Sequence, residues 1–126
     1  MMLTMGFVAL GGAIGAVLRW LWGVGVLRVG GVQDFPLAIL SANILGSFLM
    51  GAFVVLAAQR GLTHLSPFVM TGLLGGFTTF SAFSLETVTL IERGQIGSAV
   101  LYVALSVGLS LIGLALGLWI MRGILT

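Results

Sequence analysis

The chain has 126 residues, of which 60% are hydrophobic and only 6% are charged. A soluble domain carries about 25% charged residues, so this chain has too few to cover a water-facing surface. The composition excludes a soluble protein and predicts one integral membrane domain over residues 1–126. The five basic residues are all arginine and form no cluster, so we expect no nucleic-acid partner.

Four apolar runs are long enough to cross a bilayer, which needs roughly 20 residues of helix. They lie at residues 3–27, 36–58, 67–91 and 97–121, and the connections between them are short. The first run has no basic segment before it, so we expect a retained helix and not a cleaved signal peptide. Pro36 and Pro67 suit the first turn of a helix, whereas Gly61 and Gly94 suit turns. The sequence therefore predicts an all-α membrane protein with four transmembrane helices.

Glycine is frequent, with 20 residues in the chain. Gly11 and Gly15 give the first predicted helix a surface of small residues, and Gly113 and Gly117 do the same on the fourth. Small residues let helices approach closely in lipid. We expect these glycines to pack helices together, with some of them available for a dimer contact.

The arginines are nearly balanced between the two sides of the membrane. With four spans, the side that holds both termini carries Arg60 and Arg122, and the opposite side carries Arg28 and Arg93. The bias of arginine and lysine in short loops sets the orientation of a membrane protein, and here that bias is close to zero. We therefore expect the chain to insert both ways up and to pair as an antiparallel, dual-topology homodimer.

The third predicted helix contains the most unusual segment of the chain. Residues 74–86 combine a glycine pair, four hydroxyls, three phenylalanines and a carboxylate. Polar groups at membrane depth are costly unless they face protein or water, so such a cluster is a functional-site hypothesis by default. We expect this helix to break at Gly75 and Gly76. Carbonyls freed between Gly75 and Thr78 would be oxygen ligands of the kind that bind alkali cations at unwound segments.

One face of the third helix could line a path for an anion. Its members, by helical spacing, are Phe80, Phe83, Ser84 and Thr87. The edge of a phenylalanine ring carries partial positive charge, because the negative charge of its quadrupole lies on the ring face. Ordinary packing remains the alternative for these rings.

The second and fourth helices also carry polar groups at membrane depth. Asn43 shares a face with Gly46, Ser47 and Met50, and its amide either bonds another helix or points an N–H at an anion. The fourth helix presents hydroxyls four residues apart, at Tyr102, Ser106 and Ser110. These hydroxyls either continue the path or bond back to their own helix.

Two charges lie within or near the predicted spans. Arg19, beside Trp20 and Trp22, is typical of an interfacial anchor whose charged end reaches the membrane surface. Glu86 is close enough to the end of its helix to reach the interface. The chain has no metal-ligand spacing, nucleophile arrangement or phosphate-binding loop, so we expect no enzyme activity.

The segment GGFTTFSAFS at residues 75–84, followed by Glu86, resembles the GGxTTFSTFSxE signature of the Fluc fluoride channels, also called CrcB. The resemblance covers the whole chain, including LRW at 18–20 and NILG at 43–46. It implies a passive, selective channel that exports fluoride across the inner membrane. It also implies an antiparallel dual-topology homodimer with two pores and a central sodium ion.

The resemblance assigns roles to particular residues. Phe80 and Phe83 match the rings that line the fluoride path, and Arg19 matches a basic residue near its vestibule. The polar lining would be completed by Asn43, Tyr102, Ser106 and Ser110. The carbonyls of Gly75 and Thr78, taken from both subunits, match those that hold sodium. The chain departs from the family pattern at Ala82, which replaces a hydroxyl residue, and at Leu114, where the hydroxyl track stops.

Two other functions are compatible with parts of the sequence. A proton-coupled small membrane transporter would have to use Glu86, because the first helix contains no acidic residue. A membrane scaffold without transport activity would leave the polar stripes unexplained.

Overall fold

The computed structural model describes residues 1–31 and 35–126, and every element in this part of the chain is a helix. The long helices are α1 (Met2–Gly30), α2 (Leu37–Arg60) and α5 (Ile96–Leu125). The third span is divided into η1 (Thr63–Leu65), η2 (Pro67–Leu74), α3 (Gly75–Phe77) and α4 (Phe80–Glu92). Each of the four spans is long and apolar enough to cross a membrane. The four predicted spans are therefore confirmed, with ends that differ by a few residues, while part of the predicted connection 28–35 lies outside the described residues.

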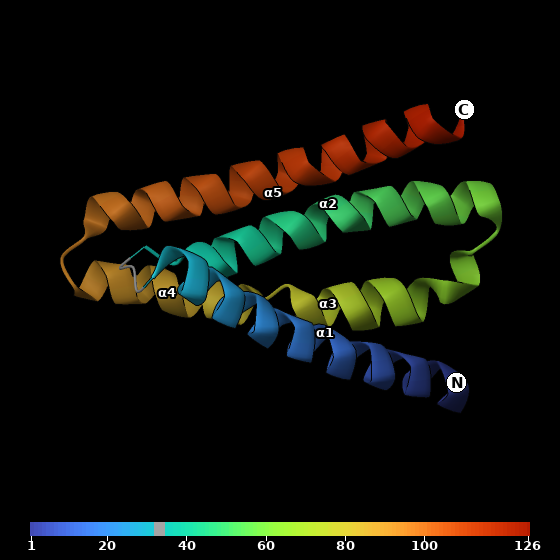
Figure 1. Cartoon of the computed structure of the whole chain (residues 1–126), viewed down its shortest axis with the longest axis horizontal. Coiled ribbons are helices and arrows are strands. Elements are labelled where there is room, and N and C mark those ends of the chain that lie inside the picture. The colour runs from blue at the N-terminus through green and yellow to red at the C-terminus, as the bar shows by residue number, and fades with distance from the viewer. Residues whose placement is uncertain (32–34) are drawn as a thin grey trace.

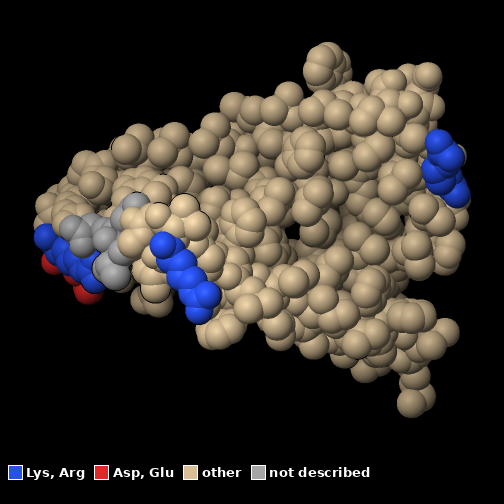
Figure 2. All heavy atoms as spheres, in the orientation of Figure 1, with Lys and Arg blue, Asp and Glu red and all other residues tan. Residues whose placement is uncertain are grey.

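The four spans run alternately up and down (Figure 1). Both termini and the connection after α2 lie at one end of the molecule, and the connections before α2 and before α5 lie at the other. Arg60 and Arg122 are in the last turns of α2 and α5, whereas Arg28 is in the last turn of α1. On the face drawn in Figure 2, the charged atoms gather toward the two ends, with an uncharged band between them. This arrangement preserves the balance of arginines expected from the sequence.

The predicted turn residues begin and end helices as expected. Pro36 immediately precedes α2, and Pro67 is the first residue of η2. Gly61 ends α2 in the left-handed conformation, with φ of 67°. Such a backbone conformation favours glycine, because a Cβ would clash with the neighbouring carbonyl.

Glycines bring the long helices into backbone contact. Gly15 of α1 is buried, and a Cβ added there would collide with the carbonyl oxygen of Leu73 in η2. Gly117 of α5 is buried in the same way against the carbonyl of Phe48 in α2. This close approach maximises van der Waals contact between helices that lipid cannot drive together. The packing interpretation of the small-residue surfaces is confirmed within this chain.

The first half of the third span is a π-helix, which the sequence did not predict. It covers all eight residues of η2, although such helices are rare and mostly limited to a single turn. The η2 backbone is pressed against α1: a Cβ on Gly72 would lie 2.9 Å from the carbonyl oxygen of Val8. The widened helix and its glycines thus place the following segment directly beside α1.

The predicted break at Gly75 and Gly76 is wrong by about one turn. Both glycines are helical, and the chain becomes extended at Thr78 (φ −85°, ψ 158°) and Thr79 (φ −152°, ψ 122°). Gly76 serves close packing instead, since a Cβ there would lie 2.7 Å from the carbonyl oxygen of Gly12. The break forms where side chains can replace the lost helical hydrogen bonds, and glycine flexibility does not determine its place.

Candidate functional site: a polar groove beside the helix break

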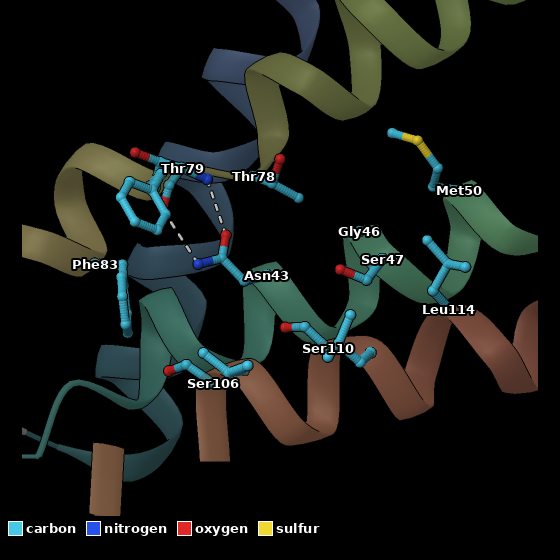
Figure 3. Close-up of a pocket in the computed structure, with 13 residues that line it drawn as sticks. Asn43, Gly46, Ser47, Met50, Thr78, Thr79, Phe83, Ser106, Ser110 and Leu114 are labelled. Carbon is cyan, nitrogen blue, oxygen red and sulfur yellow. Dashed lines mark hydrogen bonds between the residues drawn. The ribbon is translucent and has the colours of Figure 1, made fainter. Parts of the chain in front are cut away.

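A groove of about 330 Å³ runs between α2, α5 and the broken part of the third span (Figure 3). It combines the polar residues of three helices with apolar neighbours. Its lining comprises Asn43, Gly46, Ser47, Met50, Thr78, Thr79, Phe80, Phe83, Ser106, Val107, Ser110, Leu111 and Leu114. The structure therefore brings together six predicted site residues, namely Asn43, Thr78, Phe80, Phe83, Ser106 and Ser110. Gly46, Ser47 and Met50 join Asn43 in the groove, as their shared helical face predicts.

Asn43 holds the break from the side of α2. The backbone N–H of Thr79 donates to Asn43 Oδ1 at 2.8 Å, and Asn43 Nδ2 donates to the carbonyl oxygen of Thr79 at 3.2 Å (Figure 3). Of the two possibilities for this amide, the bond to another helix is the one the structure contains. An amide has a second N–H, and Asn43 is one of the residues that line the groove.

Hydroxyls complete the break. Thr78 Oγ1 donates to the carbonyl oxygen of Leu74 at 3.0 Å, and Thr79 Oγ1 accepts from the backbone N–H of Ala82 at 3.2 Å. The second contact is an N-cap, which satisfies a free donor in the first turn of α4. On the facing helix, a Cβ on Gly46 would collide with the Thr78 methyl group. Gly46 therefore makes room for the extended segment.

Four aromatic rings form a row from the groove into the protein. The ring centroids of Phe80 and Phe83 are 5.4 Å apart, and those of Phe83 and Tyr102 are 5.3 Å apart. Phe35 continues the row with an edge-to-face contact to Tyr102 at 5.7 Å and 90°. Sequence reasoning missed Phe35, because it lies in a connection whose contact with α5 has no signal in spacing.

The hydroxyls of α5 divide into two groups. Ser106 and Ser110 line the groove, whereas Tyr102 is fully buried in an apolar cluster with Leu40 and Leu90. Within the part of the chain that the structure describes, the hydroxyls of Tyr102 and Ser106 have no hydrogen-bond partner. Buried polar groups are usually paired, and an unpaired one calls for an explanation such as a bound water or ion. Leu114 lies in the groove one turn after Ser110, so the hydroxyl track ends where the sequence indicates.

Two more predicted path residues, Ser84 and Thr87, lie outside this groove, as Tyr102 does. Ser84 Oγ donates to the carbonyl oxygen of Phe80 at 3.0 Å, and Thr87 Oγ1 donates to that of Phe83 at 2.8 Å. Both hydroxyls thus bond back to their own helix. Thr87 lines a separate, mostly apolar pocket between α4 and α5, together with Ile91 and Val100.

The two charges near the spans occupy different places. Arg19 does not line the groove, and its Nε donates to the carbonyl oxygen of Gly76 at 3.2 Å. Glu86 lines a small pocket of about 190 Å³ next to Phe35 and the start of α2. Trp22, three residues after Arg19 on α1, donates its indole N–H to Ser41 Oγ at 2.9 Å and packs edge-on against Phe77. Roles for Arg19 and Glu86 in an anion path stay predictions.

Comparisons with known proteins identify relatives over the whole chain. The family model described as "CrcB-like protein, Camphor Resistance (CrcB)" matches residues 6–118. A protein of Ruegeria sp. (strain TM1040), named "Fluoride-specific ion channel FluC", is 68% identical over 126 residues, which is 100% of both chains. A protein of the same name from Roseobacter denitrificans is 72% identical over 118 residues, covering 93% of this chain and 94% of the relative. These relatives are named as ion channels and not as enzymes, in agreement with the expected lack of catalysis. A match of this extent, together with the third-helix motif, shows that the chain belongs to the CrcB family.

Proposed function

We propose that this protein is a passive, fluoride-selective channel whose anion path follows the groove beside the helix break. The observation that carries the proposal is the convergence of phenylalanine rings, an amide and serine hydroxyls in one groove, on helices long enough to span a membrane. The fluoride channels among its relatives support the same ion for this chain. Because the channel is passive, fluoride accumulated in the cytoplasm would leave down its own gradient.

The lining suits a small, strongly hydrated anion. A pore must replace the hydration shell of an ion without holding the ion too tightly for release. Weak donors such as Ser106 and Ser110, and the positive edges of Phe80 and Phe83, meet this need. None of the described residues that line the groove is an arginine, which would bind an anion strongly in a low-dielectric interior.

A second copy of the chain would complete the path. Asn43, Ser47 and Ser110 line a groove that is open along one side in the protomer, and hydrocarbon is a poor environment for such groups. Phe80 at its rim is 78% exposed. A partner inserted the other way up would cover both, and the balanced arginines favour that orientation. An antiparallel, dual-topology dimer would then contain two equivalent pores.

The break also offers the oxygen atoms of the expected sodium site. The N–H of Thr79, which in a continuous helix would bond the carbonyl of Gly75, instead donates to Asn43. The carbonyl of Thr78 lies in extended backbone, and Gly75 is exposed on the protomer surface. These oxygens are at the negative end of a helix dipole, which favours a cation. Gly75 and Thr78 therefore fit a sodium ion shared with a partner.

The test is ion efflux from proteoliposomes that contain the purified protein. We expect fluoride efflux far above that of empty vesicles, little chloride efflux, and no requirement for a proton gradient. Efflux that occurs only with a proton gradient, and that Glu86→Gln abolishes, would instead support the transporter alternative. Release no faster than from empty vesicles would refute the channel.

The membrane location and orientation have a separate test. We expect the protein to be a multi-pass component of the inner membrane. Labelling of a tagged C-terminus from each side of intact cells should find both orientations. A single orientation would contradict the antiparallel dimer while leaving the fluoride path open to test.

A further inference from the structure

The side chain of Arg19 ends on the backbone of the helix break and not in the groove. Arg19 is half-buried on α1, roughly 16 Å from the end of that helix at Gly30, so it lies well inside a helix long enough to span a membrane. Its Nε donates to the carbonyl oxygen of Gly76, the middle residue of α3. The last carbonyls of a helix lack intrahelical donors, and a basic side chain is favoured there by the helix dipole.

The break is thereby held from two sides. Arg19 of α1 donates to the carbonyl of Gly76, just before the extended segment. Asn43 of α2 bonds the N–H and the carbonyl of Thr79 within that segment. The backbones of α1 and α3 are also in direct contact, because a Cβ on Gly76 would lie 2.7 Å from the carbonyl of Gly12. The position of Phe80, which follows Thr79 directly and begins α4, depends on both attachments.

We propose that Arg19 is a positioning residue that fixes the break through its Nε–H, and that it does not act by attracting the anion with its charge. This inference goes beyond the proposed function, because it gives the Arg19 side chain the role of holding the backbone at the helix break. It rests on that function only where flux is the measurement, because the hydrogen bond also contributes to the stability of the fold.

Three substitutions separate the donor from the charge. Arg19→Gln places an amide nitrogen on Cδ, where arginine has Nε, and so keeps this donor without the charge. Arg19→Lys keeps the charge but has a methylene group at that position. Arg19→Met keeps neither. Arg28→Gln, which removes an arginine nine residues further along α1, is the matched control for loss of charge alone.

The measurements are thermal unfolding in detergent and fluoride efflux from proteoliposomes. We expect Arg19→Gln to have a higher unfolding temperature and a higher fluoride efflux than Arg19→Lys. Arg19→Met should lose roughly tenfold in fluoride efflux, the factor typical of a lost hydrogen bond to a charged donor. Arg28→Gln should match the parent protein. The proposal would be overturned if Arg19→Lys equalled or exceeded Arg19→Gln in unfolding temperature and fluoride efflux. Failure of the Arg19→Gln protein to assemble would also overturn it. If the parent protein conducts no fluoride, the ranking in unfolding temperature still decides the role of the hydrogen bond.

Discussion

Asn43 and Thr79 share two hydrogen bonds, so that one side-chain amide satisfies both backbone polar groups of a single residue, Thr79. The contact joins the first third of α2 to the break in the third span. An extended peptide unit is expensive in a membrane unless its N–H and carbonyl are bonded within the protein. Asn43 therefore allows the break to exist, and it also lies in the groove that the break opens.

Removal of the Asn43 amide should destabilise the protein. Asn43→Leu leaves the N–H and the carbonyl of Thr79 without their partner, at a cost of roughly 1–3 kcal/mol in the free energy of unfolding. Fluoride flux should fall as well. The matched control is Ser47→Ala, one turn further along the same groove, which should change stability by less than about 0.5 kcal/mol. Equal unfolding temperatures for the two variants would contradict the role assigned to the amide.

The two groove phenylalanines should respond differently to substitution. Phe80→Ile and Phe83→Ile should both lower fluoride flux, because each removes a ring edge. Phe83 also packs against the ring of Tyr102, whereas Phe80 is 78% exposed in the single chain. We expect Phe83→Ile alone to lower the stability of the protomer, by about 1 kcal/mol. Flux assays and unfolding in detergent measure the two effects, and parental flux in both variants would refute the ring-edge role.

The unpaired hydroxyls of α5 should oppose stability while serving transport. Tyr102→Phe and Ser106→Ala each remove a buried hydroxyl that has no partner among the described residues. An unsatisfied buried hydroxyl costs about 1–3 kcal/mol, so its removal should leave stability unchanged or raise it. Fluoride flux should nevertheless fall. The control is Ser84→Ala, whose hydroxyl bonds its own helix outside the groove, and which should conduct normally. Normal flux in both test variants would mean that these hydroxyls do not contact the ion.

Backbone contact at Gly15 should make that position intolerant of a methyl group. Gly15→Ala would drive its Cβ into the carbonyl of Leu73, and overpacking of this kind costs about 1–3 kcal/mol. Gly23→Ala on the same helix would place its Cβ more than 4 Å from every described residue outside its own stretch of α1, and it should be neutral or slightly stabilising because alanine favours helix. Thermal unfolding of both variants tests the contact. A Gly15→Ala protein as stable as Gly23→Ala would show that α1 can move away from the third span at no cost.

Depletion of sodium should weaken the assembly if the carbonyls of Gly75 and Thr78 bind this ion between two subunits. We expect the dimer to dissociate, or its fluoride flux to fall, after prolonged exchange into sodium-free buffer. Sodium should restore both, whereas a large cation such as N-methylglucamine should not. A dimer that keeps its mass and its flux through sodium-free exchange would count against the site.

Much of the site could be predicted because helical spacing alone determines which side chains share a face. Phe80 with Phe83, and Ser106 with Ser110, lie together in the groove for this reason. Thr87 follows the same spacing, yet it faces a different pocket, because α5 packs across α4 at that level. Spacing cannot reveal which neighbour a face will meet. The role of Phe35 could not be predicted for the same reason, because this residue lies in the loop before α2 and contacts Tyr102 in the distant helix α5.

The break shows how far composition can mislead about backbone. Gly75 and Gly76 look like the flexible point, but both are helical, and the lack of a Cβ at Gly76 is used for contact with α1. The chain leaves the helix at Thr78 and Thr79, where Asn43 and two hydroxyls supply replacement bonds. In a membrane the cost of an unpaired peptide outweighs local propensity, so the partners on other helices decide where a helix ends.

The sequence by itself determined that the chain has four membrane spans. Four apolar runs are each long enough to cross a bilayer, and the chain has too few charged residues to cover a surface in water. It also determined the family, through a run of residues too specific to arise from packing. Only the tertiary structure decided the place of the break, the hydrogen bond from Arg19 to Gly76 and which residues line the groove. These depend on hydrogen bonds and close contacts between helices far apart in the chain, which no local pattern encodes.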